Sequence, residues 1–584
     1  MEYPTLYVKQ KSRQMADAFQ GYNHNLRIGD NEFYDMMNMT SNYYPVLAPR
    51  SKRGVYVESG KASGIIAKDK LCYADGTAFV VGEDRIEMGL SYSTKDLVSM
   101  GAYVIIMPDR KYINTIKNGT EYEHGDIDAT FTTTADVKFQ LCSLTGGAYE
   151  NVTVSDAAPD PPTNNQLWID TSSTPHTLKK YSEATVQWVN IATTYIKVSS
   201  PGIGKEFKQY DGVKLSGIVA DGLTGLNPIQ VLWGCGDDYI IITGILDKVT
   251  TQTVAQGKIT VSRKMPIMDY MVESNNRIWG CHYGKNDDGE VVNEIYACKQ
   301  GDFKNWNCFM GLSTDSYAVS CGSDGQFTGA ITHLGYPLFF KENCIHKVYG
   351  DYPSNYRLQH TTCRGVQRGS HRSLAIVNET LYYKSSNAVC AYDGSLPVEM
   401  SSVLGEVRYS DAVAGAHGNK YYIDMKSADG AYHLFVYDTA KGMWHKEDNL
   451  QVDCFCSFLN EMYAIDHSTK HIITMLGSGT KDSKKVPWMV ETGLIGMSLP
   501  DMKYISKLLM RMSLEIGARV EVSIQYDSIG DWEQVCQMTV TNLRSFSVPV
   551  RLRRCDHFRI RIEGDGEGRI YSITKTIEQG SDVS

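Results

Sequence analysis

The sequence lacks the features that are typical of membrane-spanning proteins, secreted proteins and tight nucleic-acid binders. No stretch approaches the roughly 18 consecutive apolar residues of a transmembrane helix, so we expect no membrane-spanning segment. The first residues, 1–19, lack the apolar run of a secretory signal. Lys and Arg total 58 against 67 Asp and Glu, a net charge of −9. The cation surplus with which tight nucleic-acid binders neutralise phosphates is therefore missing.

Paired cysteine motifs are also missing. The chain has 14 cysteines but no Cys-x-x-Cys, and the closest pair, Cys454 and Cys456, points the same way on a strand. Most of the cysteines stand among apolar residues. We expect them to be reduced and buried in a protein made in a reducing cytoplasm, and we predict no metal and no cofactor.

Apolar residues rarely recur at the helical spacing of three and four positions. Short segments in which apolar and polar residues alternate are common instead. In Arg519–Tyr526 and in Phe558–Glu563 every second residue is apolar, which is typical of a strand with one buried face. Asp-Gly turns follow many such segments. The 37 tyrosines against 16 phenylalanines suit surfaces and interfaces, because a phenol ring has one polar end. We predict an all-β protein.

A refrain of a polar turn followed by an aromatic strand recurs about every 40 to 55 residues, the period of β-propeller blades. Its copies begin at residues 233, 276, 336, 379, 419 and 460. A stacked β-sandwich would also alternate and stays an alternative. We predict a β-propeller core, a small inserted β domain and a C-terminal domain like a β-sandwich.

Breaks in the pattern give domain boundaries. A Thr-, Ser- and Asn-rich stretch with Asp160–Thr163 interrupts the blades, and Lys481–Lys485 is a charged linker. The predicted divisions are an N-terminal arm (1–53), a discontinuous propeller (54–125 and 201–480), an insertion (126–200) and a C-terminal sandwich (486–584).

Catalytic motifs are not found. The sequence has no phosphate-binding loop, no Gly-x-Ser-x-Gly, no His-Glu-x-x-His and no sialidase turn motif, so we predict a non-enzyme without catalytic residues. Two tryptophans of the insertion, Trp168 and Trp188, are the candidate residues for stacking on a glycan.

Several short sequence motifs, here called phrases, occur in and before the repeat region in an order that resembles known proteins. The phrases are Gly301–Trp306, Pro337–Gly350, Cys363–Gly365 and, in the arm, Gly29–Asn38 with Pro45–Arg50. In this order they resemble the tail nozzle, tail hub and packaged-DNA stabilisation proteins of tailed, mainly short-tailed, bacteriophages. The resemblance covers roughly residues 20–120 and 200–480.

The resemblance implies a structural virion protein, assembled in the host cytoplasm, that forms a homo-oligomeric ring, a hexamer, below the portal and its adaptor. Such a ring would retain packaged DNA and conduct it during ejection, touching the duplex only transiently and without sequence preference. Its further partners would be a head-completion protein and tail fibre, spike or needle proteins. The alternative is a receptor-binding propeller whose insertion, 126–200, contacts host surface glycans; a propeller glycan hydrolase ranks third.

Overall fold

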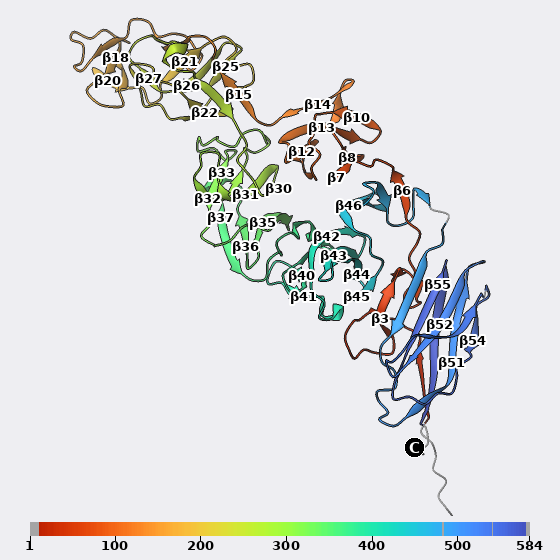
Figure 1. Ribbon diagram of the computed structural model, residues 1–584. Helices are drawn as coiled ribbons and strands as arrows, with labels where there is room; N and C mark the ends of the chain where they lie inside the picture. Colours follow the sequence, from red (N-terminus) through yellow and green to blue (C-terminus); the bar gives the residue numbers. More distant parts are fainter. Residues whose placement is uncertain (1–10, 482–483, 540, 580–584) are drawn as a thin grey trace, which may run out of the picture. The chain divides into compact units, whose positions relative to one another are not determined.

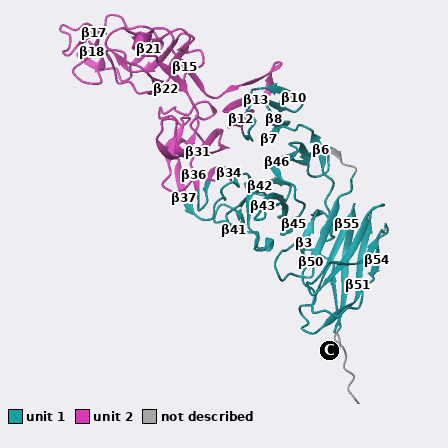
Figure 2. Cartoon of the chain, in the orientation of Figure 1, with its two compact units in different colours: residues 1–97, 340–345, 360–584 teal, residues 98–339, 346–359 magenta. Residues whose placement is uncertain are grey.

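The structure, a computed structural model, describes residues 11–481, 484–539 and 541–579 (Figure 1). Within these ranges the regular structure is strand, with four 3₁₀ turns (Val254–Gln256, Pro353–Asn355, His371–Ser373 and Ser402–Leu404) and no α-helix. No helix long and apolar enough to cross a membrane occurs in this part of the chain. The chain divides into two compact units, unit 1 (1–97, 340–345 and 360–584) and unit 2 (98–339 and 346–359) (Figure 2).

The predicted β-propeller is confirmed by a series of antiparallel sheets in which strand order follows chain order. Six blades are four consecutive strands each. They are β7–β10 (Ala62–Ala67, Leu71–Asp75, Ala78–Val81, Asp84–Glu87), β11–β14 (Asp96–Met100, Tyr103–Met107, Lys111–Asn118, Glu121–Asp126), β30–β33 (Tyr270–Ser274, Arg277–Lys285, Val291–Ala297, Tyr317–Ser320), β34–β37 (Gly329–His333, Tyr336–Lys341, Cys344–Tyr349, Arg357–Thr362), β38–β41 (Ala375–Val377, Thr380–Lys384, Val389–Tyr392, Val398–Glu399) and β42–β45 (Tyr409–His417, Lys420–Ser427, Tyr432–Asp438, Met443–Lys446).

One more blade is completed by a strand from the other end of the chain. β46 (Val452–Phe458), β47 (Glu461–Asp466) and β48 (Ile472–Thr474) pair in order, and β6 (Gly54–Val57) follows between β48 and β49 (Thr480–Lys481). The register joins Ile473 to Val55. This N-terminal strand therefore closes the last blade, as in many propellers.

Successive blades pack face to face through apolar side chains. In unit 1, Tyr73 and Val80 of the β7–β10 blade share a core with Ile465 and Ile472 of the last blade. In unit 2, Trp279 of β31 and Phe339 of β35 share another core. Consecutive buried apolar residues in these strands, such as Leu338, Phe339 and Phe340 of β35, point to opposite sides of the sheet, so both faces can be covered by neighbouring blades.

The inserted region forms its own sheets within unit 2. They are a four-stranded sheet, β15-β29-β22-β24 (Ala129–Thr132, Thr260–Arg263, Gly212–Ser216, Ile229–Val231), a five-stranded sheet, β25-β26-β21-β16-β28 (Gly234–Gly236, Tyr239–Thr243, Tyr195–Ser199, Val137–Cys142, Thr250–Gln252), a four-stranded sheet, β17–β20 (Thr153–Ser155, Leu167–Asp170, Thr177–Ser182, Gln187–Asn190), and a pair, β23 (Leu223–Thr224) with β27 (Ile245–Leu246).

These pairings correct one sequence-based boundary. Residues 201–263, assigned from sequence to the propeller, pair with 129–142 and 195–199, so the insertion extends to Arg263 instead of ending at residue 200. The copy of the refrain that begins at residue 233 is β25–β26 of the insertion and not a blade. The alternation of apolar and polar residues predicts that a segment is a strand with a buried face. It does not predict which sheet that strand joins.

The C-terminal domain is a sandwich that recruits the N-terminal residues. One sheet is β1-β56-β51-β54 (Lys11–Ala16, Gly568–Gln579, Lys503–Leu514, Arg544–Val548), and the other is β2-β3-β50-β55-β52-β53 (Gly21–Tyr22, Glu32–Met37, Pro487–Thr492, Phe558–Asp565, Arg519–Tyr526, Glu533–Met538). A small pair, β4 (Met39–Thr40) with β5 (Ala48–Pro49), follows. The predicted arm thus contributes β1, β2 and β3 to the sandwich, while residues 1–10 lie outside the described ranges, as do residues 482–483 of the predicted linker.

Candidate functional site

A polar cavity of about 450 Å³ lies in unit 2, beside the point where β14 passes into the inserted region. Its walls come from separate stretches of the chain, within 103–129, 206–211, 263 and 301–304. The charged lining residues are Glu123, Asp126, Asp128, Glu206, Asp211 and Asp302, with Lys208, Arg263 and Lys304. Because carboxylates outnumber cations, a strongly anionic ligand is a poor match for this cavity.

Three aromatic rings form one wall. Tyr103 and Tyr112 are diagonal neighbours on the same face of β12 and β13, since Ile105 is the register partner of Tyr112. Their ring centroids lie 5.1 and 5.2 Å from that of Phe303. Gly125 is the partner of Tyr112 on β14, and a Cβ there would lie 3.4 Å from the Tyr112 ring. The glycine therefore leaves that side of the ring uncovered.

The two phenols converge on one carboxylate. Tyr103 donates to Glu123 Oε2 at 2.9 Å and Tyr112 donates to Glu123 Oε1 at 3.4 Å. Lys304 Nζ donates to the Tyr112 hydroxyl oxygen at 2.8 Å. Burial, helped by Glu123, raises the pKa of both phenols. They therefore stay protonated at neutral pH and act as neutral donors.

A buried ion pair forms the floor. Asp211 pairs with the guanidinium of Arg263 and also accepts from Asn305 Nδ2 and from the Lys208 N–H, each at 2.9 Å. Asn305 Nδ2 donates to Asp302 Oδ2 as well, at 2.6 Å. Arg263 is 7% exposed, and its Nε has no hydrogen-bond partner within the described ranges. A buried N–H in a cavity wall is a donor that a ligand oxygen can satisfy.

The rim consists of paired acids. Asp126 Oδ1 lies 2.6 Å from Lys111 Nζ, and Asp128 Oδ2 lies 3.0 Å from Arg110 Nη1. Asp128 Oδ1 accepts from the Met265 N–H at 2.8 Å, which ties the chain leaving the blade to the chain that returns. This contact fixes the position of the cavity against the insertion.

The environment of Lys304 matters for the charge of the site. Burial lowers the pKa of Lys304, and the nearby Arg263 lowers it further. The ammonium group is nevertheless 4.0 Å from the centre of the Tyr112 ring, whose π face favours a cation. The cavity thus offers closely spaced donors and acceptors next to an aromatic wall.

The two tryptophans predicted to stack on glycans have different surroundings. Trp168 is 5% exposed, donates from Nε1 to the Ser155 carbonyl at 3.1 Å and has Lys179 Nζ at 4.8 Å from its ring. Its ring is therefore covered, with Lys179 and Trp188 against it, and too little of it is exposed to stack on a sugar. Trp188 is half-buried, with its ring centroid 5.3 Å from that of Trp168.

Sequence reasoning did not find the cavity. Its residues lie up to 201 positions apart, from Tyr103 to Lys304, and only the phrase Gly301–Trp306 had been singled out, for its resemblance to phage proteins. In the structure this phrase carries Asp302, Phe303 and Lys304 into the cavity. Trp306 lies beneath it in the core that Tyr112 also enters.

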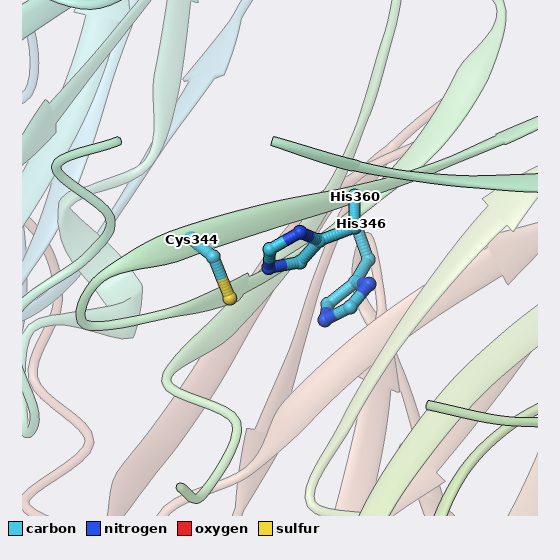
Figure 3. A group of neighbouring side chains, drawn as sticks. All are labelled: Cys344, His346 and His360. Carbon is cyan, nitrogen blue, oxygen red and sulfur yellow. The ribbon is translucent and has the colours of Figure 1, made fainter. Parts of the chain in front are cut away.

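One further cluster has the composition of a metal site. Cys344 and His346 of β36 and His360 of β37 bring their ligand atoms within 4.8 Å of one another (Figure 3). This cluster was not predicted from sequence, which gave no metal ligands. The 14 cysteines all lie within the described ranges, and none of them is in a disulfide.

Comparison with known proteins gives distant structural likeness only. No family model matches the chain, and no curated protein sequence matches it. An exo-β-1,3-galactanase from Phanerochaete chrysosporium is 8% identical, with a TM-score of 0.21 over 52% of this chain and 94% of the galactanase.

Two sialic-acid enzymes are similarly distant. A Trypanosoma rangeli sialidase is 7% identical, with a TM-score of 0.23 over 90% of this chain and 96% of the sialidase. The endosialidase of phage phi92 is 9% identical, with a TM-score of 0.16 over 78% of this chain and 64% of the endosialidase.

Proposed function

We propose that this chain is a saccharide-binding β-propeller protein of a bacteriophage tail, which binds host-surface glycan in the cavity beside β14 and does not hydrolyse it. The observation that carries the proposal is the composition of the cavity wall. Tyr103, Tyr112 and Phe303 stand opposite a floor and rim of paired acids and bases.

A sugar ring fits such a wall for two reasons. Its C–H faces pack on aromatic rings, while its hydroxyl groups both donate and accept hydrogen bonds. The cavity supplies acceptors in Glu123 and Asp302 and donors in Lys304 and Arg263 Nε. The surplus of carboxylates favours a neutral saccharide over one that carries several acidic groups.

Binding without hydrolysis is favoured by the way the carboxylates are used. Glycosidases place a protonated carboxyl group and a second carboxylate on opposite sides of the scissile bond. Here the buried carboxylate, Asp211, is engaged by Arg263, Asn305 and a backbone N–H. Asp302 accepts a hydrogen bond from the same Asn305, so both carboxylates are already engaged by donors of the protein.

The tail location is proposed from the resemblance of the repeat phrases to phage tail proteins. One phrase of that resemblance, Gly301–Trp306, supplies three residues of the cavity wall: Asp302, Phe303 and Lys304. The chain would then be a virion component assembled in the host cytoplasm, in contact with the portal adaptor or with fibre and spike proteins.

A glycan array tests the proposal. The full-length chain is applied to an array of neutral and acidic oligosaccharides, and each bound oligosaccharide is then incubated with the protein and analysed for cleavage by mass spectrometry. We expect selective binding of neutral structures with no cleavage products. An array without selective binding would contradict the saccharide site, and cleavage would contradict the non-enzymatic assignment.

The second candidate is the ring-forming nozzle that retains and conducts DNA. The net charge of −9 favours it, because a wall that conducts a duplex should not grip phosphate. Both candidates agree on a structural tail protein. They differ in whether the cavity or the inner surface of an assembled ring performs the function.

A further inference from the structure

The strongest feature outside the cavity is the group Cys344, His346 and His360. On β36, residues 344 and 346 are two apart, so their side chains leave the same face of the sheet. β37, which carries His360, is the next strand of the same four-stranded sheet, β34-β35-β36-β37. Figure 3 shows the thiol and both imidazoles turned toward a common space.

We propose that these three side chains bind a zinc-class divalent ion. A thiolate and two imidazoles are ligands that Zn²⁺ prefers, and three protein ligands leave a fourth position for water. The ligand atoms all lie within 4.8 Å of one another. A tetrahedral ion with bonds of about 2.0–2.3 Å spaces its ligands more closely, so binding draws the side chains together by about 1 Å.

The three proposed ligands differ in how deeply they are buried. Cys344 is 6% exposed and His346 is 1% exposed, whereas His360 is exposed. The two buried ligands are fixed by packing, and the exposed imidazole is the one whose rotation closes the site. Because His360 faces solvent, an ion and its water ligand have a path to the site.

The His346 ring is already oriented by a neighbour. Ser323 Oγ lies 2.6 Å from His346 Nε2, and the Phe327 ring lies 6.4 Å from the imidazole. A hydrogen bond at Nε2 assigns metal coordination to Nδ1. An outer partner of this kind fixes the ring and strengthens metal binding.

Binding releases one proton. The Cys344 thiol must lose its proton to form the S–Zn bond, and both imidazoles must be neutral, so the proton passes to solvent and affinity rises with pH. A bound ion would join β36 to β37, the outermost strand of this blade.

Metal titration of the full-length chain tests the site. The protein is stripped with a chelator, titrated with Zn²⁺ and, in parallel, with Co²⁺, whose thiolate complexes absorb in the near ultraviolet. We expect one ion per chain with a thiolate absorption band. Absence of saturable binding, or binding without that band, would overturn the proposal.

Variants assign the ligands. Cys344→Ser should abolish the band, and His360→Asn, at an exposed position where folding is not at risk, should abolish stoichiometric binding. Ser323→Ala should weaken affinity about tenfold to a hundredfold. Cys363→Ser is the matched control, because the Cys363 N–H bonds the carbonyl of Asn343 next to Cys344 but its thiol is outside the cluster.

Each result of these variant titrations supports or refutes the three proposed metal ligands. Retained binding in Cys344→Ser and His360→Asn together, or loss in Cys363→Ser, would place the ion elsewhere and refute the proposed ligands. Circular dichroism of the chelator-treated variants shows whether each is folded, and His360→Asn carries the test if Cys344→Ser is not.

Discussion

Some of the carboxyl groups buried in unit 1 are paired with a cation, and others are not. Glu447 and Asp448 meet Arg53 at 2.8 and 2.7 Å. Asp424, by contrast, is fully buried, has no cation against it in the described residues, and accepts a hydrogen bond from the Val452 N–H at 3.0 Å. Burial, with Asp448 nearby, raises the pKa of Asp424 to about 8.

Asp424 should make stability depend on pH. Because its pKa is about 8 in the folded chain against 3.8 for an ordinary aspartate, the folded state holds an extra proton between these values. Its contribution to stability is complete below pH 4 and is lost as pH rises toward 8, by up to about 1.4 kcal/mol per pH unit.

Asp424→Asn is the variant that isolates this effect. The amide keeps an acceptor for the Val452 N–H but cannot ionise, so its unfolding free energy should fall less between pH 5 and pH 8 than that of the wild type. Urea denaturation at both pH values measures it. Equal pH dependence of the two proteins would show that Asp424 is not the titrating group.

The pair Asp211–Arg263 allows a second prediction at this scale. Arg263→Met removes the cation from a buried carboxylate, which costs about 3–5 kcal/mol of folding free energy. The midpoint of thermal unfolding should drop, and Asp211→Asn in the same chain should recover part of the loss. A single variant as stable as the wild type would mean that Asp211 is not buried as a charge.

At the scale of elements, the strands were easier to predict than their partners. Copies of the refrain at 276, 336, 379, 419 and 460 coincide with the turn and second strand of a blade, β31, β35, β39, β43 and β47. These second strands are largely buried and rich in aliphatic and aromatic residues, which makes them recognisable in the sequence. The local sequence of β6 does not predict that it closes the last blade, because this closure depends on the pairing of Val55 with Ile473, far along the chain.

The same limit explains the insertion and the cavity. β15 and β29 pair Thr132 with Thr260, a contact that neither local sequence encodes. The insertion was therefore predicted to be too short, and the cavity that depends on both of its connections was missed. Composition did predict the strand content and the place where the blades are interrupted.

Closure by β6 is testable through one glycine. A Cβ on Gly54 would collide with the Ser478 carbonyl oxygen and would lie 2.9 Å from Thr474 Oγ1. Gly54→Ala should thus destabilise the last blade by about 1–3 kcal/mol. Gly322→Ala, with nothing within 4 Å of the added Cβ, is the matched control for thermal unfolding. Equal midpoints would argue against closure by this strand.

At the scale of the whole molecule, the described chain carries a propeller, an insertion and a sandwich. Asp128 Oδ1 accepts from the Met265 N–H at 2.8 Å, so the two connections of the insertion are adjacent. A short Gly-Ser linker can therefore replace residues 129–264 without stretching the blades.

This deletion separates folding from function. It removes Glu206, Lys208, Asp211 and Arg263 from the cavity. We expect a soluble propeller that retains strand content by circular dichroism and no longer binds saccharide. A deletion variant that binds as the full chain does would place the saccharide site elsewhere.

The nozzle candidate predicts assembly. Native mass spectrometry of the purified chain, alone and with an adaptor protein, should then give a closed ring with hexamer mass. A chain that stays monomeric under both conditions, and in the mature particle, would remove this candidate and leave saccharide binding unaffected.

The most direct test of the central claim is a calorimetric titration of the full chain with an oligosaccharide selected on the array, repeated with Glu123→Ala and with Glu121→Ala. Both residues are exposed on β14, but only Glu123 lines the cavity. Glu123→Ala should weaken binding about tenfold to a hundredfold, because a hydrogen bond to a charged group contributes about 1.5–3 kcal/mol. Glu121→Ala should bind as the wild type does. Equal affinities for all three proteins would contradict saccharide binding in this cavity.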